Sequence, residues 1–384
     1  MLFLSAYCCK GMIIYYFWAV LSVKVPDHSM IKNIPVNELL SLDTAIHVAD
    51  VRTPAEFEQG HIPGAFNIPL FTNEERVNVG TTYKQVGREE AILLGFDLVG
   101  PKWAGFIKQA LTIAPNKKIA LHCWRGGMRS GAMAWALDLY GFEVYLLQGG
   151  YKKYRNVALA RFNDKFDIKI LGGLTGSGKT RVLHQLKTSG EQVVDLEDLA
   201  QHQGSSFGSM NSMVQPTQEQ FENNLSGQLL HIDPLRPVWL EDESITIGKR
   251  VIPNALFHQM RDAAVYALKV PAEERVRFLV EEYGRLDKTF LKEGTERIWK
   301  RLGPVQTKDA IAAIEEDRMA DFIRIVLVYY DKTYQAGLKK RKPENIITIE
   351  CPDTNAVSNS ALILNHQHDA AQQLTAEIYN GHNN

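Results

Sequence analysis

Residues 171–180, LGGLTGSGKT, decide the fold of the second half of this 384-residue chain. They contain the pattern G-x-x-x-x-G-K-[ST], whose glycines let a loop curl around a phosphate while its backbone amides point inward. A strand-like run, DIKI (residues 167–170), precedes the pattern, and an amphipathic segment, RVLHQLKTSG (residues 181–190), follows it. Because such a loop needs a strand before it and a helix after it, the sequence predicts a phosphate-binding loop in an α/β domain.

Six residues of this loop are expected to bind phosphate. Its glycines permit close approach of the backbone, its lysine brings a positive charge to phosphate oxygens, and its threonine hydroxyl can ligate Mg²⁺. The six are Gly173, Gly176, Ser177, Gly178, Lys179 and Thr180, and Thr180 is also the expected Mg²⁺ ligand.

Acidic residues follow two further strand-like runs of the same domain. PVWLEDES (residues 237–244) is apolar up to Leu240 and continues with Glu241, Asp242 and Glu243, and Asp195 follows a shorter apolar run. Carboxylates at these places suit the holding of Mg²⁺ through a water or the polarising of a metal-bound water. The alternative interpretation is a solvated strand end. We expect Asp195, Glu241 and Asp242 to be acid or metal-binding residues.

A second informative loop begins at Cys123. This cysteine ends a β-rich run, KKIALHC (residues 117–123), and WRGGMRS leads from it into a helix-like segment (residues 131–142). Amides at a helix N-terminus and the charges of Arg125 and Arg129 favour the nucleophilic thiolate. A buried structural cysteine is the plain alternative, but packing does not require a C-x5-R-S loop with two glycines. Two chemistries use such a loop, namely that of cysteine phosphatases and that of rhodanese-type sulfurtransferases.

The segment before this loop predicts a strand and a capped helix. AIHVADVR (residues 45–52) has the pattern of a buried strand that ends in the charged residues Asp50 and Arg52. Thr53 with Glu56 three residues later forms a capping box, which predicts a short helix directly after the strand. Alternation of apolar runs with amphipathic stretches is typical of an α/β domain with a parallel sheet.

The first domain resembles the rhodanese family over roughly residues 35–155. The motif DVRTPAEFEQGHIPGAFNIP (residues 50–69) is very close to the signature of that family, and LLQGGYKKY (residues 146–154) matches its closing strand. The resemblance implies a sulfurtransferase fold with Cys123 as nucleophile. We interpret His61, a signature position, as structural.

A rhodanese domain joined to a phosphate-binding loop is a narrow combination, and over residues 40–350 the chain resembles the tRNA 2-selenouridine synthase family. One departure is that some members carry two adjacent cysteines before the loop, whereas His122 precedes Cys123 here. The motifs that carry the resemblance are VGTTYKQVG (residues 79–87), CWRGGMRS (123–130), GGYKKYR (149–155), GLTGSGKT (173–180), DLEDLAQHQGSSFG (195–208), FENNL (221–225), WLEDESITIG (239–248) and YYDKTY (329–334).

The resemblance implies a two-step reaction on tRNA. Wobble-position 2-thiouridine would first be S-alkylated by geranyl diphosphate, and selenium from selenophosphate would then displace the alkylthio group to give 2-selenouridine. Cys123 would carry the selenium as an S-selanylcysteine intermediate, Arg125 and Arg129 would act with it, and the phosphate loop would hold the diphosphate with Mg²⁺. The implied partners are the anticodon loop of tRNA and a selenophosphate-producing enzyme, with no stable membrane partner.

Two other function classes stay open on the residues alone. One is a rhodanese-type sulfurtransferase coupled to a P-loop ATPase or kinase, and the other is a non-catalytic phosphate-responsive binding module. ATP turnover without tRNA would favour the first, and nucleotide binding without any reaction would favour the second.

Composition agrees with a folded α/β protein. Hydrophobic residues make up 45% and charged residues 23% of the chain, which excludes collagen-like and disordered classes. The net charge of −1 excludes a surface that is basic throughout. A basic linker (residues 151–170) and Lys339–Lys342 could still form a local positively charged surface that binds tRNA. Four cysteines without paired spacing indicate a reducing compartment, and we expect the cytoplasm.

The expected organisation is an apolar N-terminal extension, a rhodanese-like parallel-sheet domain, a P-loop NTPase-like α/β domain and a helical C-terminal extension. Their bounds are expected at residues 1–30, 31–155, 156–270 and 271–384. The apolar stretch Met12–Val23 is shorter than the ~20 residues of a membrane-spanning helix. It is interpreted as a weak anchor, as an apolar arm, or as the product of an upstream start, with Met30 as the true first residue.

Overall fold

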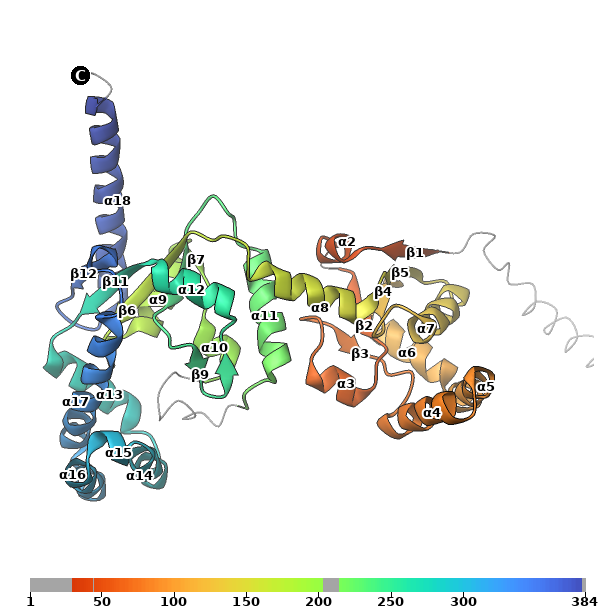
Figure 1. Cartoon of the computed structure of the whole chain (residues 1–384), viewed down its shortest axis with the longest axis horizontal. Coiled ribbons are helices and arrows are strands. Elements are labelled where there is room, and N and C mark those ends of the chain that lie inside the picture. Colours follow the sequence, from red (N-terminus) through yellow and green to blue (C-terminus); the bar gives the residue numbers. More distant parts are fainter. Residues whose placement is uncertain (1–29, 44, 203–213, 382–384) are drawn as a thin grey trace, which may run out of the picture. The chain divides into compact units, whose positions relative to one another are not determined.

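The structure is a computed structural model that describes residues 30–43, 45–202 and 214–381 (Figure 1). The chain divides into two compact units, Met1–Val157 and Ala158–Asn384, called unit 1 and unit 2 below. The expected N-terminal extension and the GSSFG part of the family motif (residues 204–208) lie outside the described residues, apart from Met30. Among the helices that the structure describes, none is both long and apolar enough to cross a membrane.

Unit 1 is built on a five-stranded parallel sheet in the order β1-β5-β4-β2-β3. Its elements are β1 (Ile31–Ile34), α2 (Val36–Leu40), β2 (His47–Asp50), α3 (Pro54–Gln59), β3 (Phe66–Asn67), α4 (Asn73–Gln85), α5 (Arg88–Val99), η1 (Gly100–Lys102), α6 (Trp103–Ile113), β4 (Lys118–His122), α7 (Met128–Leu139), β5 (Glu143–Leu147) and α8 (Gly150–Arg161), which contains the boundary between the units.

The local expectations for unit 1 are largely confirmed. The parallel sheet is present, and Thr53 and Glu56 form the expected capping box at the start of α3. Two details differ. A strand, β1, precedes the first helix and pairs with β5, and the segment expected to be a linker from residue 151 is helical up to Arg161. Both depend on contacts that a local pattern does not contain.

Unit 2 has a second parallel sheet in the order β12-β11-β6-β8-β7. Its elements are β6 (Ile168–Gly173), α9 (Lys179–Thr188), β7 (Gln192–Val193), α10 (Leu196–Ala200), α11 (Gln218–Leu230), β8 (Val238–Glu241), β9 (Thr246–Ile247), β10 (Arg250–Val251), α12 (Asn254–Asp262), β11 (Ala264–Lys269), α13 (Ala272–Tyr283), α14 (Lys288–Arg297), α15 (Trp299–Leu302), α16 (Pro304–Glu315), α17 (Met319–Leu338), η2 (Pro343–Asn345), β12 (Ile346–Glu350) and α18 (Ala356–Gly381).

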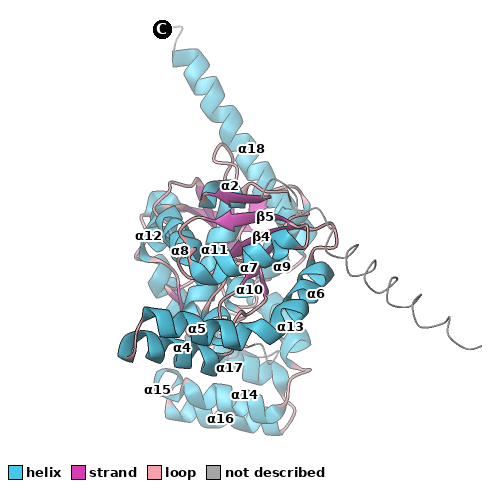
Figure 2. Ribbon diagram, turned by 90° about the vertical axis from the view of Figure 1, so that its right-hand side faces the viewer, coloured by secondary structure: helices cyan, strands magenta, loops and turns pink. Residues whose placement is uncertain are grey.

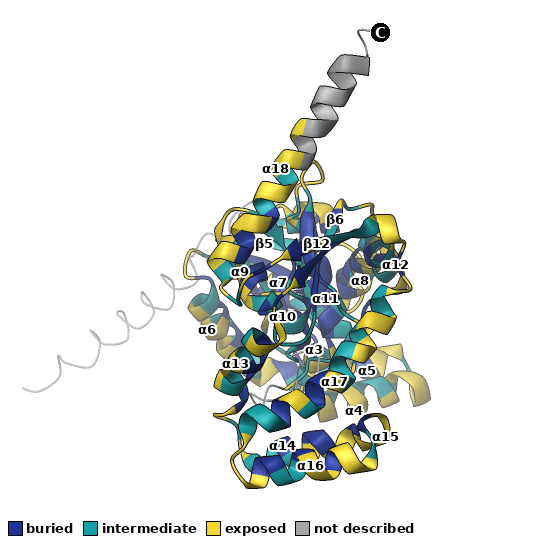
Figure 3. Ribbon diagram, turned by 90° about the vertical axis from the view of Figure 1, so that its left-hand side faces the viewer, coloured by how far each residue is buried: buried dark blue, intermediate teal, exposed yellow. Residues whose placement is uncertain are grey.

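The C-terminal part of unit 2 is helical with one exception. Helices α13 to α17 enclose a core of their own that includes Leu291, Ile314 and Phe322 (Figure 2). Buried and exposed residues alternate along α17, as expected for a helix with one packed face (Figure 3). The exception is β12, which returns to the sheet and pairs in parallel with β11. The C-terminal extension therefore helps to build the sheet that carries the phosphate-binding loop.

Candidate active sites on the two sheets

Cys123 lies directly after β4, and its side chain is buried with 4% exposure. The backbone N–H of Gly127 and the hydroxyl of Ser130 donate hydrogen bonds to its Sγ at 3.3 and 3.2 Å. Burial raises the pKa of the Cys123 thiol, but the hydrogen bonds from Ser130, Gly127 and the backbone of Arg125 together bring that pKa below its ordinary value. The loop therefore favours the thiolate, which is the reactive form of cysteine.

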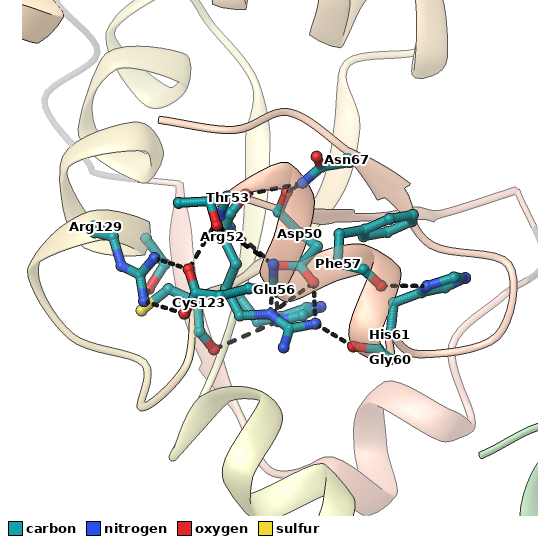
Figure 4. Close-up of polar contacts among 12 residues, drawn as sticks. Asp50, Arg52, Thr53, Glu56, Phe57, Gly60, His61, Asn67, Cys123 and Arg129 are labelled. Carbon is teal, nitrogen blue, oxygen red and sulfur yellow. Dashed lines mark hydrogen bonds and ion pairs between the residues drawn. The ribbon is translucent and has the colours of Figure 1, made fainter. Parts of the chain in front are cut away.

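The two arginines of the loop are placed differently. Arg129 donates two hydrogen bonds to the carboxylate of Glu56, at 2.6 and 3.1 Å, and Figure 4 shows its guanidinium turned toward that carboxylate. Arg125 is exposed. Arg129 is thus held in place by α3, whereas Arg125 is accessible to a ligand that approaches from solvent.

A buried ion pair lies beneath the cysteine loop. Arg52 donates to both carboxylate oxygens of Asp50, at distances between 2.5 and 3.0 Å, and to the carbonyl oxygen of Gly60 at 2.7 Å (Figure 4). Its guanidinium carbon lies 3.8 Å from the centre of the Tyr151 ring. The ion pair and the contact of Arg52 with Tyr151 connect the end of β2 with the start of α8, and so stabilise the backbone next to the cysteine loop.

Gly150 is required where α8 meets the loop. The backbone N–H of Tyr151 donates to the carbonyl oxygen of Cys123 at 2.9 Å. A Cβ at Gly150, which has a φ of +58°, would lie 2.4 Å from that same oxygen. The family motif that begins at Gly149 is thereby explained by close backbone packing under the cysteine. His61 packs its ring on Phe57 and its Nδ1 lies 2.9 Å from the carbonyl oxygen of Phe57, in agreement with a structural role.

The six expected phosphate-binding residues extend from the last residue of β6, through the connecting loop, to the first two residues of α9. Gly176 and Gly178 have φ values of +82° and +76°, which a residue with a side chain rarely adopts. The Nζ of Lys179 donates to the carbonyl oxygen of Gly173 at 3.0 Å. Ser177 Oγ is buried and has no hydrogen-bond partner among the described residues. A loop with a lysine at its mouth and an unpaired buried hydroxyl fits an anionic ligand.

Carboxylates gather beside this loop. Glu241, which ends β8 and is 1% exposed, receives a hydrogen bond from the Thr180 hydroxyl, and its Oε1 has no partner among the described residues. One oxygen each of Glu197, Glu241 and Glu243 lies within 4.8 Å of the others. Burial and the charge of Asp195 raise the pKa of Glu241, and burial with the charges of Glu197 and Glu241 raises the pKa of Glu243 well above its ordinary value.

This donor set fits a divalent cation. Carboxylate and hydroxyl oxygens are the ligands that Mg²⁺ prefers, and a cation would offset the repulsion that raises these pKa values. Glu197 was missed by the sequence analysis as a site residue, whereas Glu243 belongs to the acidic run that the sequence analysis associated with Mg²⁺ but was not among the three expected site residues. The available signal was their place in the two family motifs that contain Asp195 and Glu241.

The other two expected acids lie outside this group of three. Asp242 accepts a hydrogen bond from Arg341 at 2.5 Å, and a second ion pair joins it to Arg261 at 3.8 Å. Asp195 caps α10 by accepting from the N–H of Asp198, and its Oδ2 lies 2.7 Å from Nε2 of His184. Asp195 still acts on the site through space, because its charge raises the pKa of Glu241.

The motif YYDKTY supports the phosphate loop from α17. The hydroxyl of Tyr334 accepts a hydrogen bond from the backbone N–H of Gly173 at 2.7 Å. Asp331 forms two hydrogen bonds with Arg275, at 2.8 and 2.9 Å, and Arg275 donates a further one to the carbonyl oxygen of Thr175. Two side chains of α17 thus fix the backbone of the loop, one directly and one through Arg275.

Family models match both units. Residues 36–157 match the rhodanese-like domain, and residues 166–361 match the model described as "tRNA 2-selenouridine synthase AAA domain". Together these matches extend from α2 into α18, with residues 158–165 between them.

Proteins named tRNA 2-selenouridine synthase are similar to this chain. The Shewanella pealeana protein is 35% identical over 359 residues, which are 83% of this chain and 95% of that protein. The Hydrogenovibrio crunogenus protein is 35% identical over 77% of this chain and 90% of its own length. The Nitrosomonas europaea protein is 40% identical, and the chain spans 65% of it. With the motifs, the two-unit fold and these relatives in agreement, the chain belongs to the tRNA 2-selenouridine synthase family.

Proposed function

We propose that this protein converts wobble-position 2-thiouridine in tRNA to 2-selenouridine, by S-geranylation with geranyl diphosphate followed by selenium transfer from selenophosphate. The observation that carries the proposal is the presence, in one chain of this family, of a cysteine loop that favours the thiolate and a loop that fits an anionic phosphate ligand. A thiocarbonyl sulfur is hard to displace, and alkylation turns it into a leaving group.

The alkylation step is assigned to the phosphate loop of unit 2. The C–O bond of geranyl diphosphate breaks, the C–S bond to the base forms, N3 of the base loses its proton and diphosphate leaves. Lys179 and the backbone amides of residues 176–180 would stabilise the charge that grows on the leaving diphosphate. In this reaction the loop binds the departing diphosphate, and no ATP needs to be hydrolysed.

Mg²⁺ would be held by Thr180 and Glu241, with Glu197 and Glu243 close to it. Bound there, a divalent cation supplies positive charge for the leaving group. The unpaired Oε1 of Glu241 and the raised pKa values of the glutamates support this assignment. Thr180 would then give up its hydrogen bond to Glu241, and the oxygens of both residues would bind the same cation.

Selenium transfer is assigned to Cys123 in unit 1. Selenium has the same oxidation state in selenophosphate and in the product, so alkylated tRNA, selenophosphate and one water that cleaves the P–Se bond yield selenouridine, geranylthiol and phosphate without an external oxidant. Carriage as S-selanylcysteine withdraws two electrons when the S–Se bond forms, for which a small disulfide is the acceptor. The terminal selenium of S-selanylcysteine then attacks C2 of the alkylated base, and geranylthiol leaves. Two thiols return the two electrons by reducing the S–Se bond, so that selenium stays on the base as 2-selenouridine, the Cys123 thiol is regenerated and the disulfide is recovered.

The base must be accessible for both steps, and the single-stranded anticodon loop makes it so. Arg125, exposed beside Cys123, is a residue that could contact phosphate or selenophosphate there.

The deciding experiment is nucleoside mass spectrometry of 2-thiouridine-containing tRNA incubated with the full chain, geranyl diphosphate, Mg²⁺, selenophosphate, and a thiol–disulfide pair. The proposal expects S-geranyl-2-thiouridine without selenophosphate and 2-selenouridine with it. Absence of both products, together with ATP turnover in the absence of tRNA, would instead support the sulfurtransferase coupled to an ATPase.

A further inference from the structure

Unit 1 contains a cavity of about 610 Å³ that neither Cys123 nor the phosphate loop accounts for. Its lining comes mainly from α4, α5 and α7, with Trp103 from the start of α6, and Figure 1 shows α4 and α5 side by side in unit 1. Its wall is predominantly apolar and includes Phe71, Val79, Ile92, Val99 and Trp103. Cavities between about 300 and 1,000 Å³ with such walls are typical of small-molecule sites.

One end of the cavity adjoins the cysteine loop. Met128 and Arg129, the first two residues of α7, line it. The residue before them is Gly127, whose N–H donates to Sγ of Cys123. Burial lowers the pKa of the Arg129 guanidinium, but Glu56 raises it above its ordinary value, and the charge of the Cys123 thiolate adds to this increase. A ligand in the cavity would therefore have one end next to the loop that holds Cys123.

Apolar side chains stay exposed where this cavity meets solvent. Phe96 is 65% exposed and Met128 is 62% exposed, although both line the cavity. Large exposed apolar groups around a pocket are a common mark of a site that is covered when its ligand binds. They indicate an apolar ligand.

The charged residues of the wall are all cationic. Arg76, Lys84 and Arg129 line the cavity, whereas none of the lining residues, all within the described stretch 45–202, is acidic. The charge of Arg129 is balanced by Glu56, which is not a lining residue, so Arg76 and Lys84 supply the positive charge of the wall. An apolar cavity with only cationic side chains fits an amphiphile with an apolar chain and an anionic remainder. A prenyl chain attached to an RNA has this character.

We propose that this cavity binds the ten-carbon alkyl chain on the sulfur of the alkylated wobble base, and so presents that base to Cys123 for selenium transfer. This inference rests on the proposed function, since it names the part of unit 1 that recognises the alkylated intermediate. The chain lies among α4, α5 and α7, and the cationic side chains face RNA phosphates. Unit 1 thereby distinguishes alkylated tRNA from the 2-thiouridine form.

A binding comparison tests the inference with the full chain. The probes are one fluorescent anticodon stem-loop with 2-thiouridine and the same stem-loop with S-geranyl-2-thiouridine. We expect the wild type to bind the geranylated probe at least about tenfold more tightly, since even one methylene in an apolar pocket changes affinity by about that factor. Equal affinities for the two probes would overturn the inference.

Two neighbouring residues of α5 provide a matched pair of variants. Ile92 lines the cavity, whereas Leu93 is 65% exposed and does not. Ile92→Glu is expected to abolish the preference for the geranylated probe, and Leu93→Glu to retain it. Ala132→Phe, which fills the cavity without adding charge, is expected to act like Ile92→Glu. Because the readout is a ratio of two affinities for one preparation, a variant with a reduced folded fraction still gives a usable value.

The outcomes separate this inference from the proposed function. A wild type that makes 2-selenouridine but binds both probes equally would overturn the inference alone. A wild type that prefers the geranylated probe but makes no 2-selenouridine would overturn the function alone. Retention of the preference by both Ile92→Glu and Ala132→Phe would place the alkyl chain elsewhere and refute the inference.

Discussion

The hydroxyl of Ser130 donates a hydrogen bond to Sγ of Cys123 at 3.2 Å, from the first turn of α7 back to the end of β4. This contact and the N–H of Gly127 offset the effect of burial on the thiol and lower its pKa. The nucleophilic form of the cysteine therefore depends on a side chain seven residues away, at the end of the C-x5-R-S pattern.

Ser130→Ala is expected to raise the pKa of Cys123, because the thiolate loses a hydrogen-bond donor while its burial remains. The midpoint of thiolate ultraviolet absorbance against pH should move upward, and alkylation by iodoacetamide near neutral pH should slow down. Cys123→Ser supplies the control that identifies the signal, since the chain has four cysteines. An unchanged midpoint in Ser130→Ala would show that the hydroxyl does not stabilise the thiolate.

Cys123→Ala is expected to stop selenium incorporation while geranylated tRNA accumulates, because the two steps are assigned to different units. Nucleoside mass spectrometry of the tRNA after incubation measures both products. Formation of 2-selenouridine by this variant would refute the carrier role. Intact-protein mass spectrometry of the wild type, incubated with selenophosphate and a disulfide, should show one added selenium that the variant lacks.

Lys179→Ala is expected to slow geranyl transfer by about 100-fold or more, since the growing charge on diphosphate loses its nearest cation. Thr180→Ala should have a smaller effect, because Glu241 remains to bind the metal. Lys187→Ala is the matched control, as this exposed lysine lies in the last turn of the same helix, α9. Undiminished transfer in Lys179→Ala would remove the loop from the mechanism.

Glu241 and Glu243 predict a link between pH, Mg²⁺ and stability. Their folded pKa values are raised, so the native state binds more protons than the unfolded state, and stability falls as pH rises above the ordinary value of 4.5 toward the raised values. Mg²⁺ should reverse this loss by pairing with the ionised groups.

The measurement for this link is the melting temperature with and without Mg²⁺ across that pH range. The increase caused by Mg²⁺ should be larger at the higher pH and should be reduced in Glu241→Gln. Glu350→Gln is the control, since that side chain is 71% exposed. If the increase in melting temperature caused by Mg²⁺ did not depend on pH, or were the same in Glu241→Gln as in the wild type, the assigned site would be contradicted.

Arg52→Met is expected to destabilise unit 1 by about 3–5 kcal/mol, because it leaves the carboxylate of Asp50 buried without its partner. Lys269→Met breaks the exposed ion pair with Glu350 in unit 2 and should cost less than about 1 kcal/mol. Urea unfolding followed by tryptophan fluorescence compares the two. If Arg52→Met lost no more unfolding free energy than Lys269→Met, the buried ion pair would not stabilise the segment that carries the cysteine loop.

The sequence alone was sufficient for features that depend on near neighbours along the chain. The phosphate-binding loop, the cysteine after β4 and the capping box of Thr53 and Glu56 each lie within a short segment, in which backbone conformation and hydrogen bonds follow from local residue types. These local patterns were specific enough to indicate the family and both α/β units.

The tertiary structure decided what distant segments do together. Asp242 and Arg341 are 99 residues apart and form one ion pair, so Asp242 lies outside the group formed by Glu197, Glu241 and Glu243. Pairing of β12 with β11 likewise joins segments that a largely helical stretch separates. The apolar cavity beside Cys123 is decided in the same way, because a cavity exists only where three packed helices leave space between them. Such contacts depend on chain topology and side-chain volume, which no short motif contains.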